Sequence, residues 1–262
     1  MSERAAHGGA RRPRGFLAGV AFLTRIPVRV GIGETDVAAS IAWFSVVGVL
    51  VGAVSGAVYV GARELWPSGL AAVLAVGASV ALTGAFHEDG LGDTADAFGA
   101  VSTGRDPGPV LKDPRLGTFG VVALVGGLGL RVAGVAALTP RAGLLALIAA
   151  HALARGVSAA VLVSAPSVAS GLGSTYAGLA PRWRGWVACG VGIVVATVCL
   201  GPAGPIASVA AGLAAWALSS WAARALGGVS GDVLGAIEQV GEILALLVAV
   251  AAIARGFAGP LA

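Results

Sequence analysis

The chain has 262 residues, of which 57% are hydrophobic and only 11% are charged, and its mean hydropathy is +0.90. Such a composition excludes an ordinary soluble domain of this length and predicts a polytopic membrane protein, an all-α bundle of transmembrane helices. The formal charge of +4 comes from 17 basic against 13 acidic residues. Because no basic stripe is interleaved with aromatic residues, we expect no nucleic-acid partner and assign the excess charge to loops at the membrane.

The N-terminal segment is basic and then apolar, like a signal peptide. Residues 1–14 are expected to be a flexible tail, and residues 15–23 an apolar helix. Thr24, Arg25 and Pro27 follow with no nearby cleavage signature, which favours a retained helix that is interfacial or re-entrant. The rest of the chain, residues 15–258, is expected to form a single membrane-embedded domain.

Seven membrane spans are predicted from runs of about 20 apolar residues, with Pro and Gly as breaks. The uncharged run of 39 residues from Gly185 to Ala223 is divided at Gly201–Pro205. The predicted spans are residues 37–62, 67–86, 118–138, 142–163, 184–200, 205–223 and 234–255.

The distribution of Lys and Arg predicts the orientation. With the N-terminus inside, twelve of these residues fall in inside segments and three, Arg63, Arg141 and Arg255, fall outside. This topology places residues 87–117, 164–183 and 224–233 on one cytoplasmic face. We therefore expect a multi-pass protein of the bacterial inner membrane with its active face in the cytoplasm.

Six of the thirteen acidic residues lie between Phe86 and Gly120, directly after an uncharged run. If residues 87–96 are helical, Asp89, Asp93 and Asp96 share one face at i, i+4 and i+7. This oxygen-only ligand set fits Mg²⁺, which also accepts substrate phosphates, whereas His87 is better suited to orient a carboxylate or move a proton. The alternative is a solvated acidic helix start.

Two further segments carry charged residues on the same predicted face. Asp113 could complete the metal site while Lys112 and Arg115 hold phosphate, although a positive flank of a span would look similar. Around Gly228, backbone N–H groups could surround an anion, or the glycines could form a hinge. A hinge does not explain why acidic residues enter the apolar segment that follows; these are Asp232, Glu238 and Glu242.

Charged residues also occur inside predicted spans, where they are costly and usually face a polar cavity. His151 and Arg155 stand one turn apart, and Arg155 is expected to bind a phosphate or a carboxylate. Arg131 could do the same or snorkel to the membrane surface. Oxygen ligands for a metal beside arginines indicate phosphoryl transfer, in which positioning and charge neutralisation dominate catalysis.

Four motifs in order make the chain resemble the cobalamin synthase family, also called adenosylcobinamide-GDP ribazoletransferase. They are Phe22–Pro27, His87–Asp96, Asp113–Gly120 and Leu226–Glu242, and the resemblance runs from about residue 16 to 250. One departure is Glu88, where family members often have a hydrophobic residue.

The resemblance implies a Mg²⁺-dependent membrane enzyme that joins α-ribazole, or its 5'-phosphate, to adenosylcobinamide-GDP and releases GMP. By this resemblance Asp89, Asp93 and Asp96 would be the Mg²⁺ ligands, with Asp113 as a fourth, and one of them or His87 would take the hydroxyl proton. The cations Arg25, Lys112, Arg115 and Arg155 would bind the pyrophosphate. Asp232, Glu238 and Glu242 would position ribazole or a second ion. The lipid bilayer is the other expected partner, and association into homo-oligomers is left open.

Two rivals remain at this stage. A membrane phosphotransferase of the CDP-alcohol class also places carboxylates on helices, but its Asp-Gly-x-x-Ala-Arg opening is absent, because Gly90 is followed by Leu91–Thr94. A membrane transporter would need polar residues in the outer half of the spans, whereas here they gather on one side.

Overall fold

A computed structural model describes residues 11–29, 31–111, 113–168 and 180–256. These residues form helices joined by short connections and, within that described part, no β-strand apart from an isolated bridge between Ser167 and Val229. The helices are α1 (Arg11–Leu23), α2 (Glu34–Ser40), the 3-10 helix η1 (Ile41–Trp43), α3 (Phe44–Arg63), α4 (Ser68–Thr83), α5 (Phe86–Ser102), α6 (Pro107–Val110), α7 (Thr118–Ala136), α8 (Pro140–Ser164), α10 (Arg182–Leu200), α11 (Ala203–Ala225) and α12 (Gly231–Ala254).

The predicted spans coincide with these helices to within a few residues. Six helical segments among the described residues are long and apolar enough to cross a membrane, and the bent pair of α4 and α5 would make a seventh. The predicted break after Leu200 is confirmed: Gly201 has a φ of +58°, which L residues rarely adopt, and Pro202 follows it. Helix α1 begins at Arg11, inside the segment predicted as a flexible tail, and residues 1–10 lie outside the described part.

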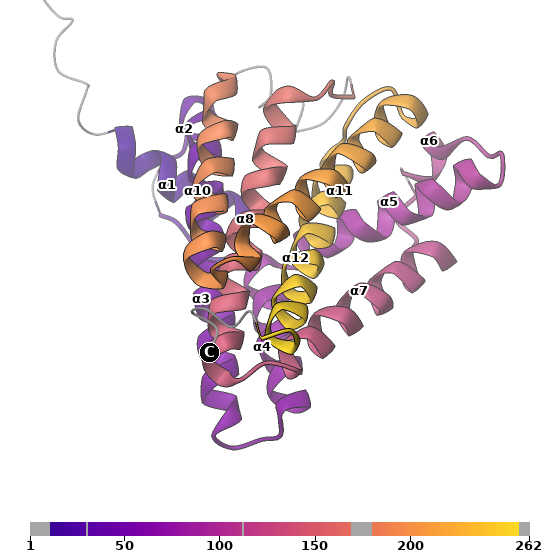
Figure 1. Ribbon diagram of the computed structural model, residues 1–262. Helices are drawn as coiled ribbons and strands as arrows, with labels where there is room; N and C mark the ends of the chain where they lie inside the picture. Colours follow the sequence, from indigo (N-terminus) through magenta and orange to yellow (C-terminus); the bar gives the residue numbers. More distant parts are fainter. Residues whose placement is uncertain (1–10, 30, 112, 169–179, 257–262) are drawn as a thin grey trace, which may run out of the picture.

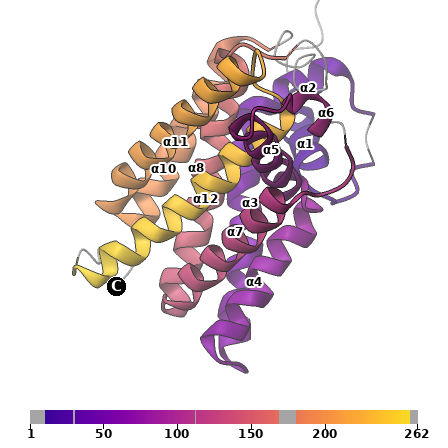
Figure 2. The ribbon, with the colours of Figure 1, turned by 90° about the vertical axis from the view of Figure 1, so that its right-hand side faces the viewer.

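One end of the bundle gathers the segments that were predicted to share a face. In both views the helices α1, α2 and α6, the end of α8 and the junction of α11 with α12 lie at the upper end, while the turn between α3 and α4 lies at the lower end (Figures 1 and 2). The isolated bridge of Ser167 with Val229 ties the end of α8 to that junction. This arrangement brings residues far apart in sequence to one end of the molecule.

Helix α8 is the centre of the core, in contact with α3, α10 and α12. Three glycines of α3 let it approach α8 closely: a Cβ atom on Gly48 would lie 2.8 Å from the Cα of Ala152, and one on Gly52 would lie 2.6 Å from the Cα of Ile148. Gly56 faces Leu144 in the same way. Small residues at four-residue spacing thus allow the two helix backbones to approach, as is typical of helix packing in membranes.

The outer faces of α7, α10 and α11 are apolar and exposed. Val122, Val198 and Trp216 are 67%, 68% and 70% exposed. Large exposed apolar surfaces of this kind are typical of lipid contact. Arg131 of α7, Arg155 of α8 and Glu242 of α12 are instead buried within the bundle.

A sharp turn between α4 and α5 directs the acidic helix. Gly84 and Ala85 both have a positive φ, of 70° and 59°, and the two helices are bent by 91°. The N–H of Arg25 donates to the carbonyl of Leu82 at 2.7 Å, so the segment after α1 supports the turn. As a result α5 leaves the direction of α4 and runs obliquely beside α7 (Figure 1).

Candidate active site

The segment of residues 87–96 is helical, as the spacing of its aspartates required. Asp89 is exposed, and Asp93 is partly buried one turn further along α5. The start of α12 packs against this helix closely enough that a Cβ atom on Gly90 would lie 2.7 Å from the carbonyl oxygen of Asp232. Aspartates from two helices therefore share one region.

The neighbouring carboxylates raise the pKa of Asp93. Its pKa is raised from 3.8 to about 6, first by partial burial and then by the negative charges of Asp89, Asp232 and Asp96. Carboxylates that repel one another in this way favour a cation between them, because a positive charge would offset both the burial and the repulsion. Asp89, Asp93 and Asp232 offer only hard oxygen donors, which is the donor type that Mg²⁺ prefers.

Asp96 occupies a different place from the one predicted for a metal ligand. Its two oxygens accept hydrogen bonds from the N–H groups of Gly117, at 2.7 Å, and Gly120, at 2.9 Å. These are free N–H groups of the first turn of α7, so the carboxylate caps that helix. The structure shows this structural role, and the role in metal binding stays a prediction.

Asp113 lies in the connection between α6 and α7 and pairs with Arg115. The guanidinium donates to both carboxylate oxygens, from Nε at 2.9 Å and from Nη2 at 2.8 Å. These side-chain hydrogen bonds lower the pKa of Asp113 to about 2. Two predicted site residues, Asp113 and Arg115, therefore pair with each other. Lys112, which precedes Asp113, lies outside the described residues.

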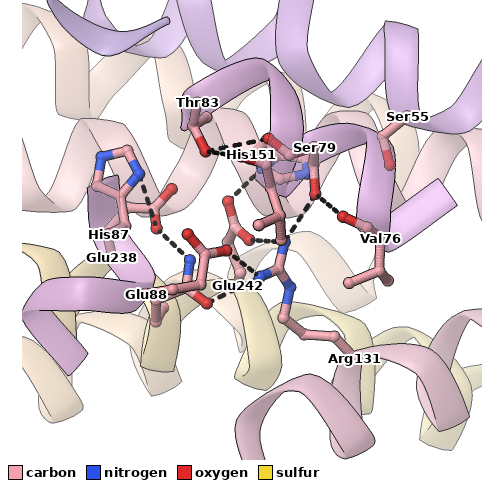
Figure 3. A network of polar contacts seen from close by, with 12 residues as sticks. Ser55, Val76, Ser79, Thr83, His87, Glu88, Arg131, His151, Glu238 and Glu242 are labelled. Atoms are coloured by element: carbon pink, nitrogen blue, oxygen red, sulfur yellow. Dashed lines mark hydrogen bonds and ion pairs between the residues drawn. The ribbon is translucent and has the colours of Figure 1, made fainter. Parts of the chain in front are cut away.

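A network of buried charges joins five helices in the centre of the bundle (Figure 3). Arg131 of α7 donates to Glu88 of α5 at 2.7 Å and to Ser79 of α4 at 2.9 Å, and it pairs with Glu242 of α12 at 3.0 Å. Arg155 of α8 pairs with Glu238 at 2.7 Å and with Glu242 at 2.9 Å. Both arginines are 2% exposed, so Arg131 does not snorkel.

This network differs from the predicted substrate-binding role of Glu242. His151 Nδ1 contacts the carboxylate directly, and both arginines surround it. With its charge neutralised by these partners, Glu242 lies away from the cavity wall described below. His151, Glu238 and Glu242 are the one group of three metal-ligating residues found among the described residues with donor atoms within 4.8 Å of one another. Since two arginines already neutralise them, a cation has little to gain there.

His87 stands at the edge of the network. It is 5% exposed, and its Nδ1 lies 3.7 Å from Oε2 of Glu238, which also accepts from Gln239 at 3.0 Å. Figure 3 shows the other ring nitrogen on the side away from the network. A carboxylate behind one nitrogen leaves the other as the reactive position of the imidazole.

Two remaining predicted residues lie at turns. Arg25 is exposed and its side chain lies against Gly84, at the turn that leads into α5. Gly228 differs from the predicted anion cradle: its N–H donates to the carbonyl of Ala222, and a Cβ atom there would lie 2.7 Å from the backbone of Ser167. The hydrogen bond of Gly228 therefore closes the turn after α11, and its lack of a side chain leaves room for the backbone that follows α8.

A cavity of about 360 Å³ opens beside His87 and the start of α12. Its wall contains apolar side chains from α1, η1, α3, α5 and α8 and a set of polar residues, which are His87, Asp89, Arg155, Ser158, Ser167, Ser230, Asp232 and Glu238. The Phe22–Pro27 and His87–Asp96 motifs and the segment before Glu242 therefore meet at one cavity. Its position at the upper end of the bundle makes it the candidate active site.

Comparison with known proteins decides the family. The model of the family described as cobalamin-5-phosphate synthase matches residues 15–250. This chain belongs to that family. Similar proteins named adenosylcobinamide-GDP ribazoletransferase occur in Bradyrhizobium diazoefficiens, with 41% identity over 88% of this chain and 90% of the relative, and in Ralstonia pickettii, with 36% identity over 87% and 91%. The Klebsiella pneumoniae protein of the same name is 34% identical over 89% and 98%. No solved structure matches the chain.

The pairing of Arg131 with Glu88 was not predicted from the sequence of this family member. The hydrogen bonds that Arg131 donates to Ser79 and Gln239 were not predicted either. The available signal was charge balance: Arg131 stands alone in an apolar run, and acidic residues such as Glu88 enter other helices. A buried charge needs a partner of opposite charge, so each of the two residues required one. Nothing in the spacing of the two residues along the chain identified that pair.

Proposed function

We propose that the protein joins α-ribazole, or its 5'-phosphate, to adenosylcobinamide-GDP in a Mg²⁺-dependent phosphoryl transfer at the cavity beside His87. The family gives it a transferase role in cobalamin biosynthesis, and its relatives carry the name of this reaction. The single observation that carries the placement is that His87 and Asp89 from one motif and Asp232 from another line one cavity. We further propose that this end of the bundle faces the cytoplasm across the bacterial inner membrane.

The acidic face of α5 and the start of α12 offer the oxygen donors that a magnesium ion prefers. Asp89 and Asp93 would hold the ion, with Asp232 directly or through water. One or two carboxylates are the usual protein share of such a site, because Mg²⁺ keeps several waters and takes substrate phosphate oxygens in its other positions. When bound there, the ion supplies positive charge that neutralises the diphosphate of the substrate.

In the proposed reaction a ribazole hydroxyl attacks the phosphorus attached to the cobinamide arm. A P–O bond to the ribazole oxygen forms, the P–O bond of the pyrophosphate breaks, and GMP leaves with its electron pair. His87 accepts the hydroxyl proton on the nitrogen that faces away from Glu238. Arg155 and Gln239 hold Glu238, and Glu238 orients the imidazole as a positioning residue.

The exposed cations are assigned to the phosphates. Arg25 lies at the turn that leads to His87 and would contact the leaving phosphate. Lys112 and Arg115 are assigned to the same phosphates. Arg155 is withdrawn from this set because glutamates surround its guanidinium. In this scheme the exposed cations bind substrate, whereas the buried cations connect helices.

The test uses the full chain purified into detergent micelles, with GMP release measured from adenosylcobinamide-GDP and α-ribazole. We expect release that depends on both substrates and on Mg²⁺ and stops with a chelator. In His87→Gln we expect kcat to fall by about 10²–10⁴-fold while the KM values of both substrates stay within a small factor. Uptake of a substrate into liposomes without any GMP release would contradict the proposal.

A further inference from the structure

The apolar side of the cavity has no part in the chemistry described above, yet it is built from aromatic side chains. Phe22 of α1 stacks on Phe44 of α3 with ring centroids 5.9 Å apart and an angle of 15° between the planes. Phe22 also meets Phe86 of α5 edge to face at 5.7 Å. All three line the cavity, and Ile41 and Leu162 extend the wall.

Polar residues also line the cavity; they are His87, Asp89, Arg155, Ser158, Ser167, Ser230, Asp232 and Glu238. Phe86 and His87 are neighbours in sequence with ring centroids 5.1 Å apart, so the aromatic wall ends directly at the imidazole. Asp89 and Asp232 follow beyond it. A ligand that fits this cavity has a flat apolar part for the wall and hydroxyl groups for the polar residues.

We propose that the aromatic wall is the binding site of the benzimidazole base of ribazole, an inference that rests on the proposed function. Three parts of the substrates compete for the cavity. The corrin ring is too large, because about 360 Å³ lies at the small end of the usual range of roughly 300–1,000 Å³ for ligand pockets. Guanine carries donors and acceptors around its edge, which an apolar wall would leave unpaired at a cost.

The dimethylbenzimidazole base suits the wall. It is flat and aromatic, and its two methyl groups and fused ring are apolar, so it can stack on phenylalanine rings without losing hydrogen bonds. With the base against Phe22, Phe44 and Phe86, the attached ribose lies at the His87 end. This placement brings the attacking hydroxyl to the group proposed to take its proton.

The same placement explains why the segment from Phe22 to Arg25 belongs to one motif. Phe22 and Leu23 line the cavity, whereas Arg25 lies at the turn before α5. The apolar half of the segment would contact the base of one substrate and the cation would contact the diphosphate of the other. The two substrates would then meet between α1 and α5.

The test fills the cavity from α8 by enlarging an apolar side chain. Val161 lines the apolar wall, and Val161→Trp would occupy the space of the base without removing a polar group. Val125→Trp is the matched control, because Val125 is 68% exposed on α7 and does not line the cavity. Binding of α-ribazole alone is measured at equilibrium with the purified full chain, and thermal melts confirm that each variant folds.

We expect Val161→Trp to weaken α-ribazole binding by about tenfold or more, which is the scale of losing an aromatic contact, and Val125→Trp to leave it unchanged. Phe86→Leu is a milder change in the wall and should weaken α-ribazole binding a few fold. It keeps the inference testable if Val161→Trp does not fold. The KM of adenosylcobinamide-GDP should change by less than about twofold in all three, since its binding groups lie elsewhere.

Two outcomes would overturn the inference: unchanged ribazole binding in both wall variants, or a rise in the KM of adenosylcobinamide-GDP in place of ribazole. Because ribazole binding is measured without turnover, it separates this inference from the proposed reaction. Loss of GMP release with tight, wall-dependent ribazole binding would reject the mechanism and keep the pocket. Normal GMP release, together with ribazole binding that does not depend on the aromatic wall, would keep the mechanism and reject the pocket.

Discussion

Two groups of acidic residues lie on α5 and α12, and they have opposite surroundings. Glu88, Glu238 and Glu242 are buried and meet two arginines, whereas Asp89, Asp93 and Asp232 lie at the accessible edge of the bundle and raise one another's energy. The neutralised group connects helices. The group without such neutralisation is the one that gains from a cation, and this difference separates the scaffold from the proposed chemistry.

The sharpest way to break this comparison is Asp93→Asn. We expect the rate of GMP release to fall by about 10³-fold, because electrostatic stabilisation by the bound ion is the largest contribution to such a reaction. The melting temperature should stay equal or rise, since the substitution removes repulsion. Asp106→Asn, at the exposed start of α6, is the control and should keep full activity. Full activity in Asp93→Asn would reject its place in the metal site.

The buried group should respond through stability. Arg131→Met leaves Glu88 and Glu242 without one of their cations, and removing one partner of a buried pair costs about 3–5 kcal/mol. Unfolding by denaturant in mixed micelles measures this loss. Adding Glu88→Leu, which removes the carboxylate that Arg131→Met leaves unpaired, should recover about 0.5–3 kcal/mol. A double variant no more stable than Arg131→Met would mean that the two side chains are not coupled.

The pH dependence should follow Asp93 in metal-free protein. Its pKa is about 6 in the folded state against 3.8 as the ordinary value, so the folded state holds the proton more tightly. That contribution to stability is complete below the ordinary pKa and is lost as the pH rises through about 6. We expect the melting temperature to fall by about 2–4 °C across this window and the slope to vanish in Asp93→Asn. Excess Mg²⁺ should also flatten it, because the ion takes the place of the proton.

The smallest expected effect separates a cap from a ligand at Asp96. Asp96→Ala removes both acceptors at the start of α7 and should cost about 0.5–2 kcal/mol. The rise in melting temperature caused by Mg²⁺ should persist, since Asp89, Asp93 and Asp232 remain. If that rise disappears with Asp96→Ala but survives Asp93→Asn, the assignment of the two aspartates must be exchanged.

Much of the fold could be predicted from the chain itself. The helices α3, α7, α8, α10, α11 and α12 follow from predominantly apolar runs of about the length of a bilayer, and the break at Gly201–Pro202 follows from backbone chemistry. The i, i+4 spacing placed Asp89 and Asp93 on one helix face, and the cobalamin synthase motifs gave the family. These properties are local, so neighbouring residues are enough to determine them.

The tertiary structure alone decided which charges neutralise one another. Arg131 meets Glu88 across 43 positions of the chain, and Arg155 meets Glu242 across 87, so no local pattern predicts either pair. The turn at Gly84 and Ala85 sets the direction of α5, and only with that direction do Phe22, Phe86 and Asp232 reach one cavity. Hydropathy determines that a residue lies in a helix within the membrane, but the energy of a buried charge depends on the partners that packing brings to it.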